Sequence, residues 1–90
     1  MRVRAFDWDA GNIDHIARHG GVEPHEAEIA CRGEAVVLRG REGRYLVYGR
    51  TGAGRYLFMV IHSQGQGVAR IITARDMTER EQRFYRQRRR

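Results

Sequence analysis

The chain has 90 residues and a mass of 10.5 kDa, which is enough for one domain and too little for two. A hydrophobic content of 41% can form a small core, so the composition excludes a disordered chain. No apolar run approaches the roughly 18 residues that a membrane-spanning helix needs, and no apolar signal segment follows the first residues. We therefore expect one folded domain over residues 1–90, located in the cytoplasm and without a membrane partner.

The charge is distributed unevenly along the chain. All 17 basic residues are arginines. Residues 1–34 hold 4 arginines and 7 acidic residues, a net charge of −3, whereas residues 35–90 hold 13 arginines and 4 acidic residues, a net charge of +9. Guanidinium groups bind phosphate oxygens bidentately, so the second part indicates a nucleic-acid partner. On charge alone, a general use of arginine in place of lysine explains the same count.

Two helices are predicted near the start of the chain, after a possible short strand over residues 2–6. Residues 9–19 begin with an aspartate, carry apolar residues at helical spacing and are followed by two glycines. A second, short helix has Pro24 at its first position and ends before Gly33. Cys31 lies on the apolar side of this helix, so we interpret it as a core residue rather than a catalytic thiol.

After residue 34 the hydrophobic pattern becomes that of strands. Four strands are predicted, over residues 35–39, 44–51, 56–62 and 68–74, joined by short glycine-bearing turns that suit antiparallel hairpins. The third strand is almost continuously apolar, which places it centrally, with both helices on one face. A capping box from Thr78 to Glu81 begins a last helix, and the chain ends in an arginine-rich tail. The predicted class is α+β: two N-terminal helices, a four-stranded antiparallel sheet and a C-terminal helix.

Arginines recur on the predicted strands, at Arg44, Arg50, Arg55, Arg70 and Arg75. Arginines that converge on one phosphate would stabilise the charge that develops when a 2′-hydroxyl attacks the adjacent phosphate of RNA. This reaction also needs a proton acceptor and donor, and the candidates are His19, His62, Glu42 and Tyr85, among which a histidine is the usual choice. For any single arginine, a solvated or ion-paired side chain is an equally good explanation.

Other patterns are weaker. His15 and His19 have the spacing of two zinc ligands on one helix face, but no further ligands at suitable spacing complete a tetrahedral site, so we predict neither a metal nor a cofactor. Tyrosines lie near the arginines and could stack on RNA bases, although a half-buried sheet explains them as well: Tyr45, Tyr48, Tyr56 and Tyr85. The tail residues Arg86, Arg88, Arg89 and Arg90 are either solvated or contact RNA or an acidic partner.

Several short segments, taken in their order and spacing, resemble one known family, the BrnT-type toxins of bacterial type II toxin-antitoxin systems. They are Phe6-Asp7-Trp8-Asp9, Ala17-Arg18-His19-Gly20, Glu26-Ala27, Gly49-Arg50-Thr51 and residues 71–81. The resemblance implies a RelE-like fold, a ribonuclease that inhibits translation, and a ribbon-helix-helix antitoxin that binds operator DNA. Operator DNA would then be contacted only through the antitoxin.

The resemblance also suggests roles for individual residues. It assigns phosphate binding and charge stabilisation to Arg44, Arg50 and Arg75, and acid or base catalysis to His19. We expect further RNA contacts from Arg55, Arg70, Tyr45 and Tyr85. Many members carry a lysine where this chain has Gly11-Asn12, so an alternative is a catalytically inactive RelE-like module that acts only in a repressor complex with its antitoxin.

Overall fold

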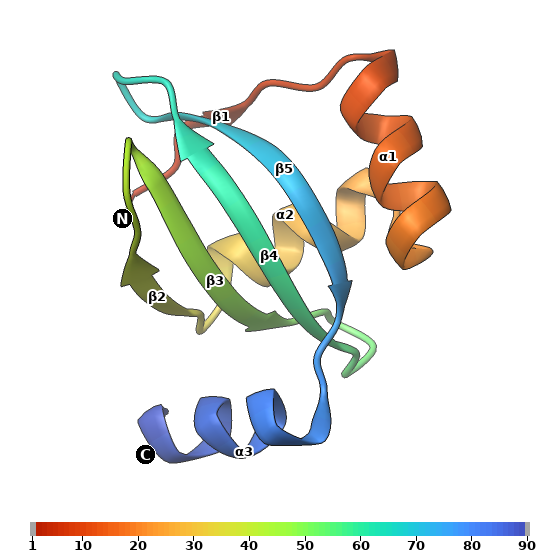
Figure 1. Ribbon diagram of the computed structural model, residues 1–90, viewed down its shortest axis with the longest axis vertical. Helices are drawn as coiled ribbons and strands as arrows, with labels where there is room; N and C mark the ends of the chain where they lie inside the picture. The colour runs from red at the N-terminus through yellow and green to blue at the C-terminus, as the bar shows by residue number, and fades with distance from the viewer. Residues whose placement is uncertain (1, 90) are drawn as a thin grey trace.

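The computed structural model describes residues 2–89 and contains a twisted sheet with two helices on one face and a third helix across one end (Figure 1). Helix α1 packs against β5, and α2 packs against β3 and β4. The elements are β1 (Ala5–Phe6), α1 (Ala10–Gly20), α2 (Pro24–Arg32), β2 (Val36–Arg39), β3 (Arg44–Arg50), β4 (Tyr56–Ser63), β5 (Val68–Asp76) and α3 (Glu79–Arg88).

The sheet has five strands in the order β1-β5-β4-β3-β2, so β4 is central as predicted. The prediction of a four-stranded antiparallel sheet is wrong in one respect, because β1 pairs in parallel with β5. The Asp7 amide donates to the Ala69 carbonyl at 2.9 Å, and the Arg4 amide donates to the Gly67 carbonyl at 2.7 Å. Such a short strand cannot bury a hydrophobic face by itself, and its pairing partner more than 60 residues away leaves no local sequence signal.

Local sequence signals fix the helix ends. Asp9 caps α1 by accepting from the Asn12 amide at 3.1 Å, and the Asn12 side chain accepts from the Asp9 amide at 2.8 Å. Asn12 is nearly buried and also donates to the carbonyl of Asp7 at 3.0 Å. Thr78 and Glu81 form the predicted capping box of α3. Asn12 therefore has a structural role in this chain, linking the start of α1 to the segment before it.

The hydrophobic core lies between the sheet and the layer formed by α1 and α2. Its largest fully buried side chains include Ile16 of α1, Val47 of β3 and Met59 of β4. Cys31 belongs to this core, as predicted, with its sulfur 3.7 Å from that of Met59. Burial raises the pKa of the Cys31 thiol to about 12, so the thiolate needed for nucleophilic chemistry does not form at neutral pH.

Helix α3 closes one end of the sheet. It extends to Arg88, into the segment that the sequence predicted as a basic tail. The hydroxyl of Tyr85, which is almost fully buried, donates to the Glu34 carbonyl at 2.8 Å. Arg86 and Arg88 belong to the helix, and Arg89 forms an ion pair with Glu34. Three of the four tail arginines are therefore part of the fold, while Arg90 lies outside the described residues. No helix in the described part of the chain is long and apolar enough to span a membrane.

Candidate functional site

The strand register brings four of the five strand arginines to one side of the sheet. Across the strands, His62 is the partner of Arg44 and Arg70, Tyr56 that of Arg50, and Phe58 that of Arg75. Residues directly opposite one another share a face, and this face alternates with the one on which Val47 and Met59 meet the helices. We call the side that points away from α1 and α2 the arginine face.

At the end of the arginine face that α3 covers, Arg75 is held in place by three neighbours. Its guanidinium forms a bidentate pair with Glu81, with distances of 2.8 Å from Nη1 to Oε1 and 3.0 Å from Nη2 to Oε2. Nη1 also donates to the Asp76 carbonyl at 3.0 Å. The guanidinium lies 4.4 Å from the centre of the Phe58 ring. Of its five N–H groups, the one on Nε and one on Nη2 have no hydrogen-bond partner within residues 2–89.

Two further arginines lie over the ring of a tyrosine at the same end. The guanidinium groups of Arg50 and Arg86 lie 4.8 and 5.5 Å from the centre of the Tyr56 ring. The pKa of the Tyr56 phenol is lowered, most strongly by Arg86 and also by Arg50. No carboxylate forms an ion pair with Arg50 among residues 2–89, so its donors are available to an anion. We call Arg50, Tyr56, Arg75, Glu81 and Arg86 the basic cluster.

Aromatic packing attaches α3 to this end of the face. Phe84 lies 4.9 Å from Tyr48, and Tyr48 lies 5.1 Å from Phe58, measured between ring centres. Burial raises the pKa of the Tyr48 phenol. Because Glu81 belongs to the same helix, the position of α3 determines whether Arg75 keeps its carboxylate partner.

We expect the Glu81 pair to make stability depend on pH. The hydrogen bonds from Arg75 lower the pKa of Glu81 below its ordinary value of 4.5, so the pair stabilises the fold above that pH and is lost as the pH falls through the folded-state pKa. At pH 7, Glu81→Gln should lose about 1 to 2 kcal/mol in urea unfolding. The difference from wild type should shrink as the pH falls below 4.5 and through the folded-state pKa, and a difference that stays constant with pH would contradict this assignment.

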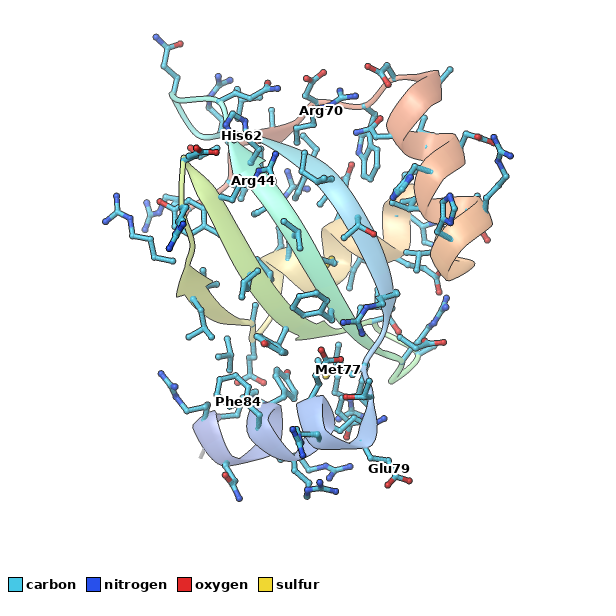
Figure 2. All side chains as sticks on the ribbon, viewed as in Figure 1. Arg44, His62, Arg70, Met77, Glu79 and Phe84 are labelled. Atoms are coloured by element: carbon cyan, nitrogen blue, oxygen red, sulfur yellow. The ribbon has the colours of Figure 1, made fainter. Side chains whose placement is uncertain are left out.

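The other end of the arginine face carries Arg44, His62 and Arg70, which Figure 2 shows together at the end remote from Phe84 and α3. Arg70 contacts Asp7 at 3.3 Å and Asp9 at 3.0 Å, and these ion pairs fasten the segment between β1 and α1. Six residues separate Tyr56 from His62 along β4, which at about 3.3 Å per residue is about 20 Å. Arg44 and the basic cluster therefore cannot contact the same phosphate.

The structure does not bring all the sequence-predicted site residues to this face. Tyr45 lies on the helix side of the sheet, half-buried against the core. Tyr85 belongs to α3, and its side chain is almost fully buried, with its ring centre 5.9 Å from that of Tyr56. His19 is exposed on α1 with its ring 4.6 Å from that of His15. Within residues 2–89, His19 has no hydrogen bond or ion pair with an arginine.

Arg55 occupies a junction between several elements. Its Nε donates to Asp76 at 2.7 Å, Nη2 donates to the Gly20 carbonyl at 2.9 Å, and Nη1 donates to the Gly21 carbonyl at 2.9 Å. Nη1 also contacts Glu26 at 3.2 Å. The pKa of Arg55 is raised, most strongly by Asp76 and also by Glu26. In this structure its donors are committed to holding α1, α2 and β5 together.

Sequence reasoning missed the contribution of α3 to the site. Arg86 was grouped with the tail, and Glu81 was assigned only to a cap and a motif position. A bidentate partner six residues along the chain has no periodic signature, because a bend separates β5 from α3. Within the described residues, no group of three or more His, Cys, Asp or Glu side chains is placed to hold a metal ion.

Comparison with known proteins decides the family. A sequence model described as "Ribonuclease toxin, BrnT, of type II toxin-antitoxin system" matches residues 8–81. This range contains strands β2 to β5 and both members of the Arg75–Glu81 pair. The chain belongs to this family. The BrnT toxins are ribonuclease toxins, and membership implies an antitoxin partner and an RNA substrate.

A solved structure supports the BrnT fold. The crystal structure of the Brucella abortus ribonuclease toxin BrnT superposes with a TM-score of 0.69, covering 83% of this chain and 97% of that one. The sequence identity is 14%, so this likeness concerns the fold. No curated protein matches the sequence of this chain. As the BrnT resemblance predicted, the fold is α+β with three helices.

Proposed function

We propose that this protein is a metal-independent endoribonuclease that cleaves RNA, including mRNA or ribosome-bound mRNA, and thereby inhibits translation in the cytoplasm. A ribbon-helix-helix antitoxin would neutralise it and contact operator DNA. The observation that carries the proposal is the arginine face, where strand register gathers four arginines on the side of the sheet away from α1 and α2. This arrangement suits a phosphate backbone that runs along the strands.

Cleavage would take place at the basic cluster. Arg75 keeps two N–H groups without a partner in residues 2–89 while Glu81 fixes its position, and Arg50 has no carboxylate partner there. Such preorganised donors stabilise the charge that develops on the phosphate oxygens. The 2′-hydroxyl would lose its proton as its oxygen attacks the phosphorus, the bond from phosphorus to the 5′-oxygen would break, and the 5′-oxygen would take a proton from water, giving a 2′,3′-cyclic phosphate and a 5′-hydroxyl. Arg44, His62 and Arg70, about 20 Å away, would contact other nucleotides.

Tyr56 is the best-placed group to accept the proton of the 2′-hydroxyl. The guanidinium groups of Arg50 and Arg86 lie 4.8 and 5.5 Å from the centre of its ring, and both lower the pKa of its phenol. His19 lies on α1 and has no such contact with the cluster. The proposal therefore uses Tyr56 in place of the histidine that the family resemblance suggested.

The test measures cleavage of total RNA by the purified protein in the presence of EDTA, together with growth after induced expression. We expect wild type to cleave RNA and arrest growth, whereas Arg75→Ala should lose activity at least about 100-fold because a fixed charged donor is removed. Tyr56→Phe should lose activity but retain affinity for 2′-O-methyl RNA. The matched control is Arg18→Ala, which removes an exposed arginine of α1 and should cleave like wild type.

One observation favours a second candidate function. Glu81 already accepts hydrogen bonds from two of the five N–H groups of Arg75, and structural ion pairs of this kind occur without a catalytic role. A folded wild-type protein that leaves RNA intact and does not arrest growth would contradict the ribonuclease proposal. The chain would then be a catalytically inactive module that acts through its antitoxin as a repressor.

A further inference from the structure

The outer edge of β2 offers unpaired backbone groups. Among residues 2–89, no strand pairs with this side of the sheet. The Gly40 amide donates to a β3 carbonyl at 2.8 Å, and in an antiparallel ladder the residues that bond the neighbouring strand alternate. Val36 and Leu38 therefore bond β3, whereas the N–H and C=O groups of Val37 and Arg39 point away from the sheet.

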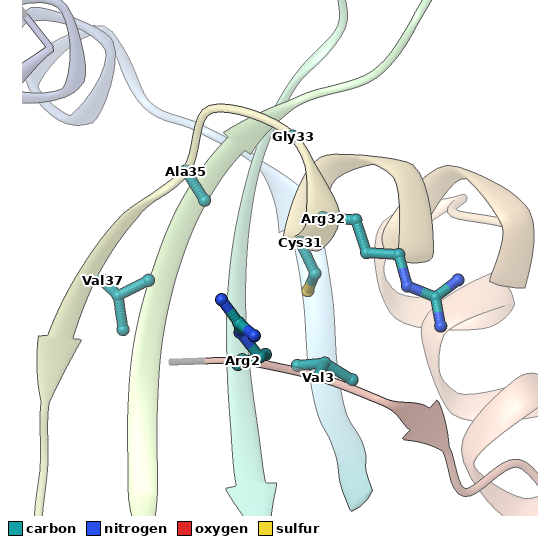
Figure 3. A pocket seen from close by; sticks show the side chains of 7 residues that line it. All are labelled: Arg2, Val3, Cys31, Arg32, Gly33, Ala35 and Val37. Carbon is teal, nitrogen blue, oxygen red and sulfur yellow. The ribbon is translucent and has the colours of Figure 1, made fainter. Parts of the chain in front are cut away.

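Beside this edge lies a hollow with a volume of about 470 Å³. Its apolar lining comes from Val3, Cys31, Ala35 and Val37, and its charged lining from Arg2 and Arg32. Figure 3 shows the Arg2 side chain extending between Val37 and Cys31, while the N-terminal segment and the end of α2 bound the space. Side chains of a strand added next to β2 would alternate between this hollow and the arginine face.

The charges around the edge favour an acidic occupant. Arg2 and Arg32 lie at the hollow, and Arg39 and Arg41 lie at the far end of β2. Within residues 2–89, only Arg32 of these four has a carboxylate partner, Glu28, at 3.5 Å and with half-exposed side chains. The nearby Glu34 is neutralised by Arg89, which leaves Glu42 as the one opposing charge in the adjoining turn.

We propose that the outer edge of β2 and this hollow bind an extended acidic segment of the antitoxin, which adds a sixth strand to the sheet and places one apolar side chain in the hollow. Backbone bonds to Val37 and Arg39 would give affinity, and the hollow and the four arginines would give specificity. The surface lies at the sheet edge rather than on the arginine face. The inference rests on the proposed function only in that it takes the antitoxin as the partner.

Backbone hydrogen exchange tests the proposal directly in the purified complex of the chain with its antitoxin. In the free chain the amides of Val37 and Arg39 should exchange rapidly, whereas those of Val36 and Leu38 are protected by β3. Complex formation should slow exchange at Val37 and Arg39 at least 100-fold. Unchanged exchange at these two amides in a formed complex would overturn the proposal, and so would the failure of a folded chain to bind the antitoxin.

Two substitutions separate backbone pairing from other contacts. Val37→Pro removes an outward N–H, which an edge strand tolerates, and should weaken antitoxin binding by 10-fold or more, whereas Val37→Thr keeps the amide and should bind normally. Arg39→Glu should also weaken binding at low salt, and the charge-matched Arg18→Glu on α1 should not. Equal affinities within either pair would overturn the assignment.

Two other occupants are outcomes of the same experiments. Slowed exchange at Val37 in the concentrated free chain, with a doubled mass, would show that a second copy covers the edge and would overturn the antitoxin assignment. RNA protection of these amides would do the same. Cleavage of RNA by Val37→Pro should match wild type, so a failure of the ribonuclease proposal, seen as intact RNA with wild type, is distinguishable from a failure of this one.

Discussion

Replacement of Gly20 by alanine is expected to leave little folded protein at 37 °C. A Cβ atom at Gly20 would lie 1.9 Å from the Ala74 carbonyl oxygen and 2.9 Å from its carbon, and both are backbone atoms of β5. Neither group can rotate aside, so α1 would have to move away from the sheet. We expect a loss of about 3 kcal/mol or more, a large part of the roughly 5 to 13 kcal/mol expected for a domain of this size.

Urea unfolding monitored by circular dichroism measures this loss. The matched control is Gly52→Ala, because a Cβ atom at Gly52 has no heavy atom within 4 Å and its backbone does not require glycine. Gly52→Ala should unfold within about 0.5 kcal/mol of wild type. A Gly20→Ala variant as stable as this control would show that α1 does not approach β5 as closely as described.

The close approach at Gly20 has a counterpart on the other helix. A Cβ atom at Gly49 of β3 would lie 2.3 Å from the Ala30 carbonyl oxygen of α2. Each helix therefore reaches the sheet through a glycine, on the helix in one case and on the strand in the other. Both contacts lie on the side opposite the arginine face, so they fix the helix layer without occupying the surface proposed to bind RNA.

The sequence predicted those parts of the fold that depend on local patterns. Hydrophobic periodicity placed the helices and four of the strands, and the capping box at Thr78 located the start of α3. The pairing of β1 with β5 was not predictable, because a two-residue strand has no period. Strand ends also differed, since β5 continues to Asp76, where a charged residue is accommodated by its ion pair with Arg55.

The candidate site was predictable in residue type more than in arrangement. An arginine count along the strands indicated a phosphate-binding surface, and alternation alone puts Arg44 and Arg50 on one face. Their separation of six residues places them at opposite ends of β3, which a list of motif residues does not reveal. Tyr85 was predicted to contact RNA because arginines neighbour it in the sequence, but its side chain is buried between α3 and the sheet. The tyrosine that lies beside Arg50 and Arg86 is Tyr56.

The second large effect is expected at Arg55, whose donors reach three elements. Arg55→Met would leave the Gly20 and Gly21 carbonyls and the carboxylates of Asp76 and Glu26 without their partner. The positive charge also lies at the carbonyl end of α1, where it stabilises the helix dipole. Since charge-assisted hydrogen bonds are worth about 1.5 to 3 kcal/mol and leaving such groups unpaired adds a further cost, we expect a loss of about 3 kcal/mol.

Urea unfolding of Arg55→Met and Arg55→Lys checks this expectation against Arg18→Met. Arg18 forms an exposed ion pair with Asp14 on α1, and its loss should cost less than about 0.5 kcal/mol. Lysine offers a point charge without the planar fork, so Arg55→Lys should recover only part of the stability. If Arg55 instead bound RNA, Arg55→Met would keep wild-type stability and lose RNA affinity. We expect the reverse, with reduced stability and unchanged cleavage per folded molecule, because the guanidinium is committed to the junction of α1, α2 and β5.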